Sequence, residues 1–221
     1  MSLRKIGDST KKGFRKFWFL LWEDNSLKGW LFSLVFLFVF IKFIFLPGLS
    51  LVTGTSLPLA IVESCSMYHD GNIFSTFDSW FDRHEDKYSE WSIAKEEFSS
   101  FSLRRGFSKG DILFIVGANP ETLDVGDIIL FNSGMKGTPV IHRIVQIKEI
   151  DGERIFTTMG DNNNGLLVPE NNGAGVDERE ITSDQLVGKA VFRVTPWFGW
   201  AKLIFFENLR SVSEKGFCQE N

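Results

Sequence analysis

An almost uncharged apolar run near the N-terminus constrains this chain more than any other feature. The 17 residues from Trp30 to Leu46 carry one charge, Lys42, and show no polar face as far as Ile41. A surface helix of a soluble protein normally keeps a polar stripe, whereas a helix that crosses a bilayer needs about 20 mostly apolar residues. Apolar flanks lengthen the run, so we expect a transmembrane anchor over residues 29–52.

The segment before this run predicts how the anchor is oriented. Residues 1–28 contain seven Lys and Arg residues against three acids. Because basic flanks stay on the cytoplasmic side, we expect a cytoplasmic N-terminus, a single pass through the cell membrane and an extracytoplasmic remainder. A cleavable signal peptide is the alternative, but its apolar core usually has about 7–15 residues after a short basic start. The longer leader and core here favour an uncleaved anchor.

After Pro47-Gly48 the chain predicts a mainly β, antiparallel domain over residues 53–200. Short runs rich in Val, Ile and Phe alternate there with Gly, Asp and Asn, which is the pattern of strands and turns. Asp151-Gly152 separates two such runs and is typical of a tight hairpin. The expected strands are Leu57–Glu63, Ile112–Val116, Asp127–Asn132, Val140–Ile150, Arg154–Met159 and Leu186–Val194.

Two segments depart from the strand pattern. Residues 71–106 carry aromatic side chains at helical spacing, among them Phe74, Phe77 and Trp80, and predict a helical insertion packed on the sheet. Buried packing is the favoured interpretation of these aromatic side chains, and substrate gating or membrane contact is the alternative. Residues 201–221 form a C-terminal amphipathic segment and tail. The aromatic stretch 196–206 either sits at the lipid interface or closes the β core.

Charge and cysteine usage exclude several classes of partner and site. The net charge of −4 gives no basic face for a nucleic acid. The two cysteines are Cys65, inside a candidate active-site motif, and Cys218, in a polar tail, and we expect no disulfide between them. No Cys and His spacing indicates zinc, so no metal site is expected.

The segment Ser64-Cys65-Ser66-Met67 is the first candidate for chemistry, directly after an apolar run. A serine hydroxyl becomes a nucleophile when a neighbouring base takes its proton. Ser66 can then attack a carbonyl, while the Ser64 hydroxyl and the Ser66 backbone N–H face the oxyanion. Taken alone, two serines at a strand end more often form a turn.

Three later segments supply a candidate base and acid. Gly126-Asp127 enters a buried strand, and His142 stands in a β-branched run. A histidine there is either a hydrogen-bonded core residue or a general base, because the unperturbed histidine pKa of about 6.5 suits proton transfer near neutrality. Asp161 follows a strand in Gly160-Asp161-Asn162-Asn163. It either bonds local backbone N–H groups or orients an imidazole.

The order of these segments, ending in Val-Gly-Lys-Ala-Val-Phe at 187–192, resembles the type I signal peptidases. The bacterial branch has lysine where this chain has His142, so the resemblance is to the archaeal and endoplasmic-reticulum branch. It covers about residues 57–67 and 107–200 together with the anchor. It implies Ser66 as nucleophile, His142 as general base and Ser64 in the oxyanion hole.

The third catalytic member is left open by the resemblance. Asp161 matches the aspartate of the family's Gly-Asp-Asn-Asn box. The family carries a second acid several residues further on, where this chain is apolar near Leu167; the pair Asp177-Glu178, after a lengthened segment, is the alternative source. His69 stands where the family usually has proline, two residues after the methionine, and is a rival base for Ser66.

The implied reaction is endopeptidase removal of signal peptides from secreted preproteins by a membrane-bound serine protease. The substrate would bind as an added strand, with shallow pockets for Ala-like side chains. The resemblance implies no metal or cofactor, and implies signal peptides, the lipid bilayer and the secretion translocon as partners. Two alternatives stay open: a catalytically silent membrane-tethered β binding module, and a protease dedicated to one surface-protein precursor.

Overall fold

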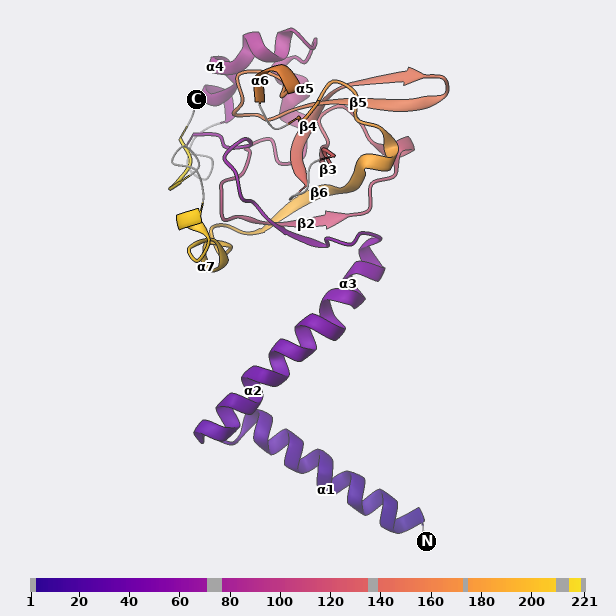
Figure 1. The fold of residues 1–221 in the computed structure, drawn as a ribbon, viewed down its shortest axis with the longest axis vertical. Coiled ribbons are helices and arrows are strands. Elements are labelled where there is room, and N and C mark those ends of the chain that lie inside the picture. Colours follow the sequence, from indigo (N-terminus) through magenta and orange to yellow (C-terminus); the bar gives the residue numbers. More distant parts are fainter. Residues whose placement is uncertain (1–2, 71–76, 135–138, 173–174, 210–214, 220–221) are drawn as a thin grey trace. The chain divides into compact units, whose positions relative to one another are not determined.

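The computed structural model describes residues 3–70, 77–134, 139–172, 175–209 and 215–219. The chain divides into two compact units, Met1–Val52 and Thr53–Asn221. Figure 1 shows helices in the first unit and a sheet with covering helices in the second.

The first unit is helical. Helix α1 spans Leu3–Trp22, and a second helix runs from Leu27 to Thr53 as α2 (Leu27–Phe40), a π-helical turn (Ile41–Phe45) and α3 (Leu46–Thr53). This 27-residue helix is long and apolar enough to cross a membrane, and none of its most apolar window is buried.

The helix continues past Pro47-Gly48, where the sequence pattern predicted a change of character. A proline ring clashes with the carbonyl four residues earlier, which for Pro47 is Phe43. That carbonyl lies in the π-helical turn, and its wider winding offers room for the ring.

The second unit is built on one antiparallel sheet of six strands in the order β1-β2-β6-β3-β4-β5. This confirms the mainly β prediction, and the predicted strands differ from the observed ones only at their ends. The observed bounds are β1 Leu59–Ile61, β2 Ile112–Val116, β3 Ile128–Phe131, β4 Val140–Ile150, β5 Glu153–Met159 and β6 Leu186–Thr195.

The β4–β5 hairpin turns through the two residues that the sequence indicated. Asp151 and Gly152 have φ values of 53° and 81°. Two consecutive positive φ angles are what a tight hairpin turn requires, because they match the twist of the flanking strands.

The insertion contains two helices, α4 (Phe77–Ser89) and α5 (Lys95–Ser100). Their aromatic residues Trp80, Tyr88 and Phe98 are buried in one cluster with Val145 and Met159 of the β4–β5 hairpin. The packing interpretation therefore fits the described part of the insertion, whereas Phe74 lies outside the described residues. Short helices complete the unit: α6 (Pro169–Asn172), α7 (Trp200–Leu203) and 3-10 turns at Pro120–Thr122, Ser183–Gln185 and Glu207–Leu209.

The C-terminal aromatic stretch contributes little to the core. Leu203 is buried, but Phe198 and Phe205 are 69% and 78% exposed. Of the two interpretations, closure of the β core therefore applies to few of these side chains.

Cys65 and Cys218 form a disulfide across 153 residues of sequence, which corrects the expectation that no disulfide joins them. That expectation rested on the polar character of the tail. Composition carries no information on where a tail docks, and here the tail reaches the turn after β1.

Candidate active site

The two candidate serines lie in a turn that follows β1, here called the serine turn (residues 64–67). The Oγ atoms of Ser64 and Ser66 are 3.1 Å apart. The backbone N–H of Tyr68 donates to the Cys65 carbonyl at 3.1 Å, which closes the turn. Met67 is 1% exposed and anchors the turn in the core, so the serine side chains are carried on a fixed backbone.

The Gly160–Asn162 segment packs against this turn from behind. The Asn162 backbone N–H donates to the Ser66 carbonyl at 2.7 Å, and Asn162 Nδ2 donates to the Cys65 carbonyl at 3.1 Å. A Cβ on Gly160 would lie 2.8 Å from the Ser66 carbonyl oxygen. Only glycine therefore allows this close approach, and the segment supports the backbone on which Ser66 stands.

His142 lies on β4, 2% exposed as a residue, with its ring on the groove described below. Its Nδ1 is hydrogen-bonded to Oε1 of Glu178, which is fully buried. A carboxylate accepts, so the network assigns the Nδ1–H donor to His142 and leaves Nε2 as the nitrogen that can take a proton.

Glu178 is held in place by two further donors. Thr158 Oγ1 donates to Oε1 at 3.0 Å, and the Leu167 backbone N–H donates to Oε2 at 2.6 Å. The Glu178 backbone pairs with Leu167 and Thr158 as well. Both carboxylate oxygens are satisfied, so the carboxylate can hold the imidazole in one orientation.

Asp161 does not contact His142, which corrects its expected place beside the base. It accepts two hydrogen bonds from Arg143, through Nε at 3.0 Å and Nη2 at 2.7 Å. Tyr88 and His69 donate to it at 2.9 Å each. Adjacent residues on a strand point to opposite faces, so His142 and Arg143 reach different acids.

The Asp161 cluster is charged and buried. Burial alone would raise the Asp161 pKa, but the Arg143 guanidinium and the His69 hydrogen bond outweigh it and hold that pKa well below its ordinary range. Arg143 also donates to the carbonyls of Ser102, Leu103 and Gly126, so it joins the insertion to the strand. This geometry gives Asp161 a structural role, because it joins the insertion, β4 and the segment that packs on the serine turn.

His69, the rival base, belongs to the same cluster. Its ring stacks on Trp80 with centroids 3.4 Å apart, and burial lowers its pKa. It is 2% exposed and is not among the residues that line the groove with Ser66.

Asp177, the other expected acid, is paired with the Arg179 guanidinium at 2.5 Å on the surface. It is the neighbouring Glu178 that reaches His142. Along this extended segment successive side chains point in opposite directions, so Asp177 faces solvent when Glu178 faces inward.

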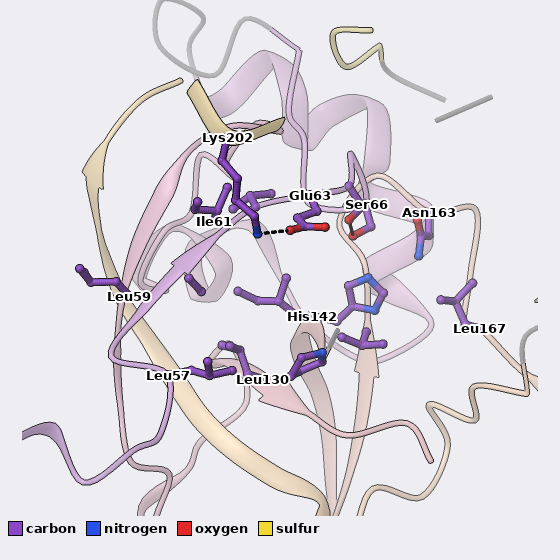
Figure 2. A pocket seen from close by; sticks show the side chains of 16 residues that line it. Leu57, Leu59, Ile61, Glu63, Ser66, Leu130, His142, Asn163, Leu167 and Lys202 are labelled. Carbon is purple, nitrogen blue, oxygen red and sulfur yellow. Dashed lines mark hydrogen bonds and ion pairs between the residues drawn. The ribbon is translucent and has the colours of Figure 1, made fainter. Parts of the chain in front are cut away.

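A groove of about 550 Å³ brings Ser66 and His142 together, and Figure 2 shows both side chains facing it. Its wall is largely apolar, with one ion pair between Lys202 Nζ and Glu63 Oε1 at 3.0 Å. The lining residues are Leu57, Leu59, Ala60, Ile61, Val62, Glu63, Ser64, Ser66, Leu130, Pro139, Val140, Ile141, His142, Asn163, Leu167 and Lys202.

Two strand edges line this groove. β1 is an outer strand of the sheet and pairs only with β2 among the described strands. β5 pairs with β4 from Arg143 onward, so the start of β4 at Val140–His142 has no described strand on that side. The groove is therefore flanked by two backbone segments with hydrogen-bonding groups available to an extended peptide.

Sequence comparison finds relatives of this chain among proteins of known function. No family model matches the chain. The catalytic subunit SEC11 of the signal peptidase complex from Lachancea thermotolerans is 36% identical over 72 residues, which cover 32% of this chain and 42% of that protein. The human catalytic subunit SEC11C is 34% identical over 65 residues, or 29% of this chain and 34% of that protein.

A longer match, to SEC11 of Yarrowia lipolytica, is 25% identical over 109 residues and covers 49% of this chain and 61% of that protein. The chain is a homologue of signal peptidase catalytic subunits. It spans less than two thirds of the length of each relative named here. The resemblance to the Ser-His branch of type I signal peptidases is thus supported by curated relatives.

Proposed function

We propose that the chain is a membrane-bound serine endopeptidase that removes signal peptides from secreted preproteins, with Ser66 as nucleophile and His142 as base. The observation that carries the proposal is the groove shared by Ser66 and the Glu178-bound His142. The similarity to signal peptidase catalytic subunits supports the same reaction.

The reaction would begin when His142 Nε2 takes the proton of the Ser66 hydroxyl as its oxygen attacks the scissile carbonyl. Glu178 stabilises the imidazolium that forms, because its carboxylate already accepts the Nδ1–H. The Ser64 hydroxyl and the Ser66 backbone N–H would face the oxyanion. His142 then gives the proton to the leaving amine. In the second half of the reaction His142 takes a proton from water, which attacks the acyl-enzyme, and returns that proton to the Ser66 oxygen.

The substrate would bind as an extended strand between β1 and the start of β4. Both edges offer backbone groups, which give affinity for any sequence, while side-chain pockets choose the residues before the bond. Ala60, Leu130 and Ile141 give the groove an apolar lining, and we expect small side chains to bind there.

The anchor would hold this groove outside the membrane, with the N-terminus in the cytoplasm. The helix Leu27–Thr53 has the required length and composition, and the basic 1–28 segment sets the orientation. Exposed aromatic side chains near the C-terminus, such as Trp197 and Phe198, are suited to the lipid interface. A signal peptide lies in the bilayer with its cleavage site at the surface, so such an enzyme would meet its substrate there.

Cleavage of a preprotein by the detergent-solubilised full chain tests the proposal. The wild type should release a signal peptide of defined length, and Ser66→Ala should abolish release. Absence of release by both proteins would instead favour a catalytically silent binding module, and equal release by both would rule out Ser66 as the nucleophile. Cleavage confined to one surface-protein precursor among several preproteins would favour the dedicated protease.

A further inference from the structure

The disulfide attaches the C-terminal tail to the one residue that separates the two candidate serines. Cys65 stands between Ser64 and Ser66, and its partner is Cys218. The tail segment described by the structure, residues 215–219, is here called the docked tail. Nothing in the proposed reaction uses it.

A second contact joins the docked tail to the same turn. Asn162 Nδ2 donates to the Gln219 carbonyl at 2.9 Å and to the Cys65 carbonyl at 3.1 Å. The Asn162 backbone N–H also donates to the Ser66 carbonyl. One asparagine therefore bridges the tail, the disulfide residue and the nucleophile residue.

The other end of the docked tail is fixed by a buried lysine. Lys109 is 1% exposed, and its Nζ contacts Glu207 Oε1 at 2.7 Å and donates to the Gly216 carbonyl at 3.3 Å. The Gly216 N–H donates to Glu207 at 2.6 Å, and the Phe217 ring lies 5.1 Å from that of Trp200. These contacts show a built docking place, so the tail is held on both sides of Cys218.

We propose that the Cys65–Cys218 disulfide, through the docked tail, is a positioning element that holds Ser64 and Ser66 in their reactive geometry. The inference rests on the proposed function. None of the described residues that line the groove belongs to the docked tail, so the disulfide reaches the groove through the turn that carries Ser64 and Ser66. A displacement of about 1 Å at a reacting group costs up to about 10²-fold in rate, so a tether at this position has large leverage.

The bond is also open to chemical control. Disulfides persist in oxidising compartments outside the cytoplasm, where the proposed topology places this domain. Dithiothreitol reduces the bond by thiol–disulfide exchange: the S–S pair takes up two electrons and two protons to give two thiols, and the reagent leaves as its cyclic disulfide. Reduction then breaks the covalent tether between the docked tail and Cys65 without changing any amino acid.

The experiment is a mutant cycle on preprotein cleavage by the oxidised, detergent-solubilised full chain. Cys65→Ala, Cys218→Ala and the double variant are compared with the wild type, each with and without dithiothreitol. Lys215→Ser is the matched control, because Lys215 is exposed in the same tail. Far-UV circular dichroism reports whether each protein, reduced or not, keeps its fold.

If the disulfide positions the serines, kcat falls about 10-fold or more in both single variants, in the double variant and in the reduced wild type. The factor is the same in all four cases, because each lacks the same bond. KM is unchanged, reductant has no effect on the variants, and Lys215→Ser behaves as the wild type. Unchanged kcat in the folded, reduced wild type would overturn the inference, as would two free thiols in the oxidised protein. A wild type that cleaves no preprotein under either condition would instead count against the proposed function.

Discussion

Glu178 Oε1 accepts the Nδ1–H of His142 in the buried wall behind the groove. The same carboxylate accepts from Thr158 and Leu167, so it is fixed by two strands and a loop before any substrate binds. This relationship gives the imidazole a single useful tautomer, with Nε2 toward the groove. The acid that orients the proposed base is therefore part of the folded framework.

Replacing Glu178 by glutamine should lower kcat by about 10²–10⁴-fold, because an amide can stabilise the wrong imidazole tautomer. Asp177→Asn is the matched control, because Asp177 is the next residue in the chain and its carboxylate pairs with Arg179 on the surface. Preprotein cleavage rates of the two variants test the assignment. Equal loss in both variants, or loss in Asp177→Asn alone, would count against it.

Asp161→Asn should act mainly on stability. Asp161 and Arg143 form a buried, bidentate pair, and removing one partner of such a pair costs about 3–5 kcal/mol. Denaturant unfolding of the detergent-solubilised protein measures this change. The double variant Asp161→Asn/Arg143→Met should lose less than the sum of the single variants, because it leaves no unpaired buried charge. Additive losses would show that the two side chains do not interact.

Stability should fall as the pH drops below about 6.5, the unperturbed histidine pKa. Burial lowers the pKa of His69 in the folded protein. Below about pH 6.5 the unfolded chain therefore binds more protons at this residue than the folded chain, and the free energy of unfolding decreases. The depressed Asp161 pKa adds a second loss below about pH 4, with the same sign. His69→Gln keeps a donor for Asp161 but does not titrate, so its thermal midpoint should depend less on pH between 5 and 7. Parallel pH profiles for both proteins would contradict this origin.

The bacterial branch of the resembled family uses lysine as base, and Lys202 lines this groove. Its Nζ is paired with Glu63, so we expect it to shape the groove mouth and to take no part in proton transfer. Lys202→Met should change kcat by no more than about fivefold, whereas His142→Ala should lower it by about 10³-fold or more. The comparison uses the same preprotein at saturating concentration. A larger loss in Lys202→Met than in His142→Ala would assign the base to the lysine.

Local sequence signals predicted the strands and the candidate pair, because period, turn chemistry and residue type are local. β4 was evident from its β-branched run, and the hairpin from Asp151-Gly152. His142 stood out for the same reason, as the one histidine embedded in a strand. Such local signals are enough to predict the fold class and to name Ser66 and His142 as candidate reactive groups.

The third member of the site depended on information that is not local. Asp161 matched a motif, yet its carboxylate is hydrogen-bonded to Arg143, the residue after the proposed base His142. Glu178 follows a lengthened segment, and only the pairing of its backbone with Thr158 and Leu167 brings it to His142. Had that pairing been known, the opposite directions of the Asp177 and Glu178 side chains could have been predicted. The disulfide was missed for a similar reason, because a docked tail has no local sequence signature.

The most direct test of the account is whether Ser66 and His142 act as one unit. Single-turnover cleavage of a preprotein is measured for the wild type, Ser66→Ala, His142→Ala and the double variant, each shown to be folded. The account predicts losses of about 10³-fold or more in both single variants, and a double variant no slower than the slower single one. Substantial cleavage by either single variant, or losses that multiply in the double variant, would contradict it.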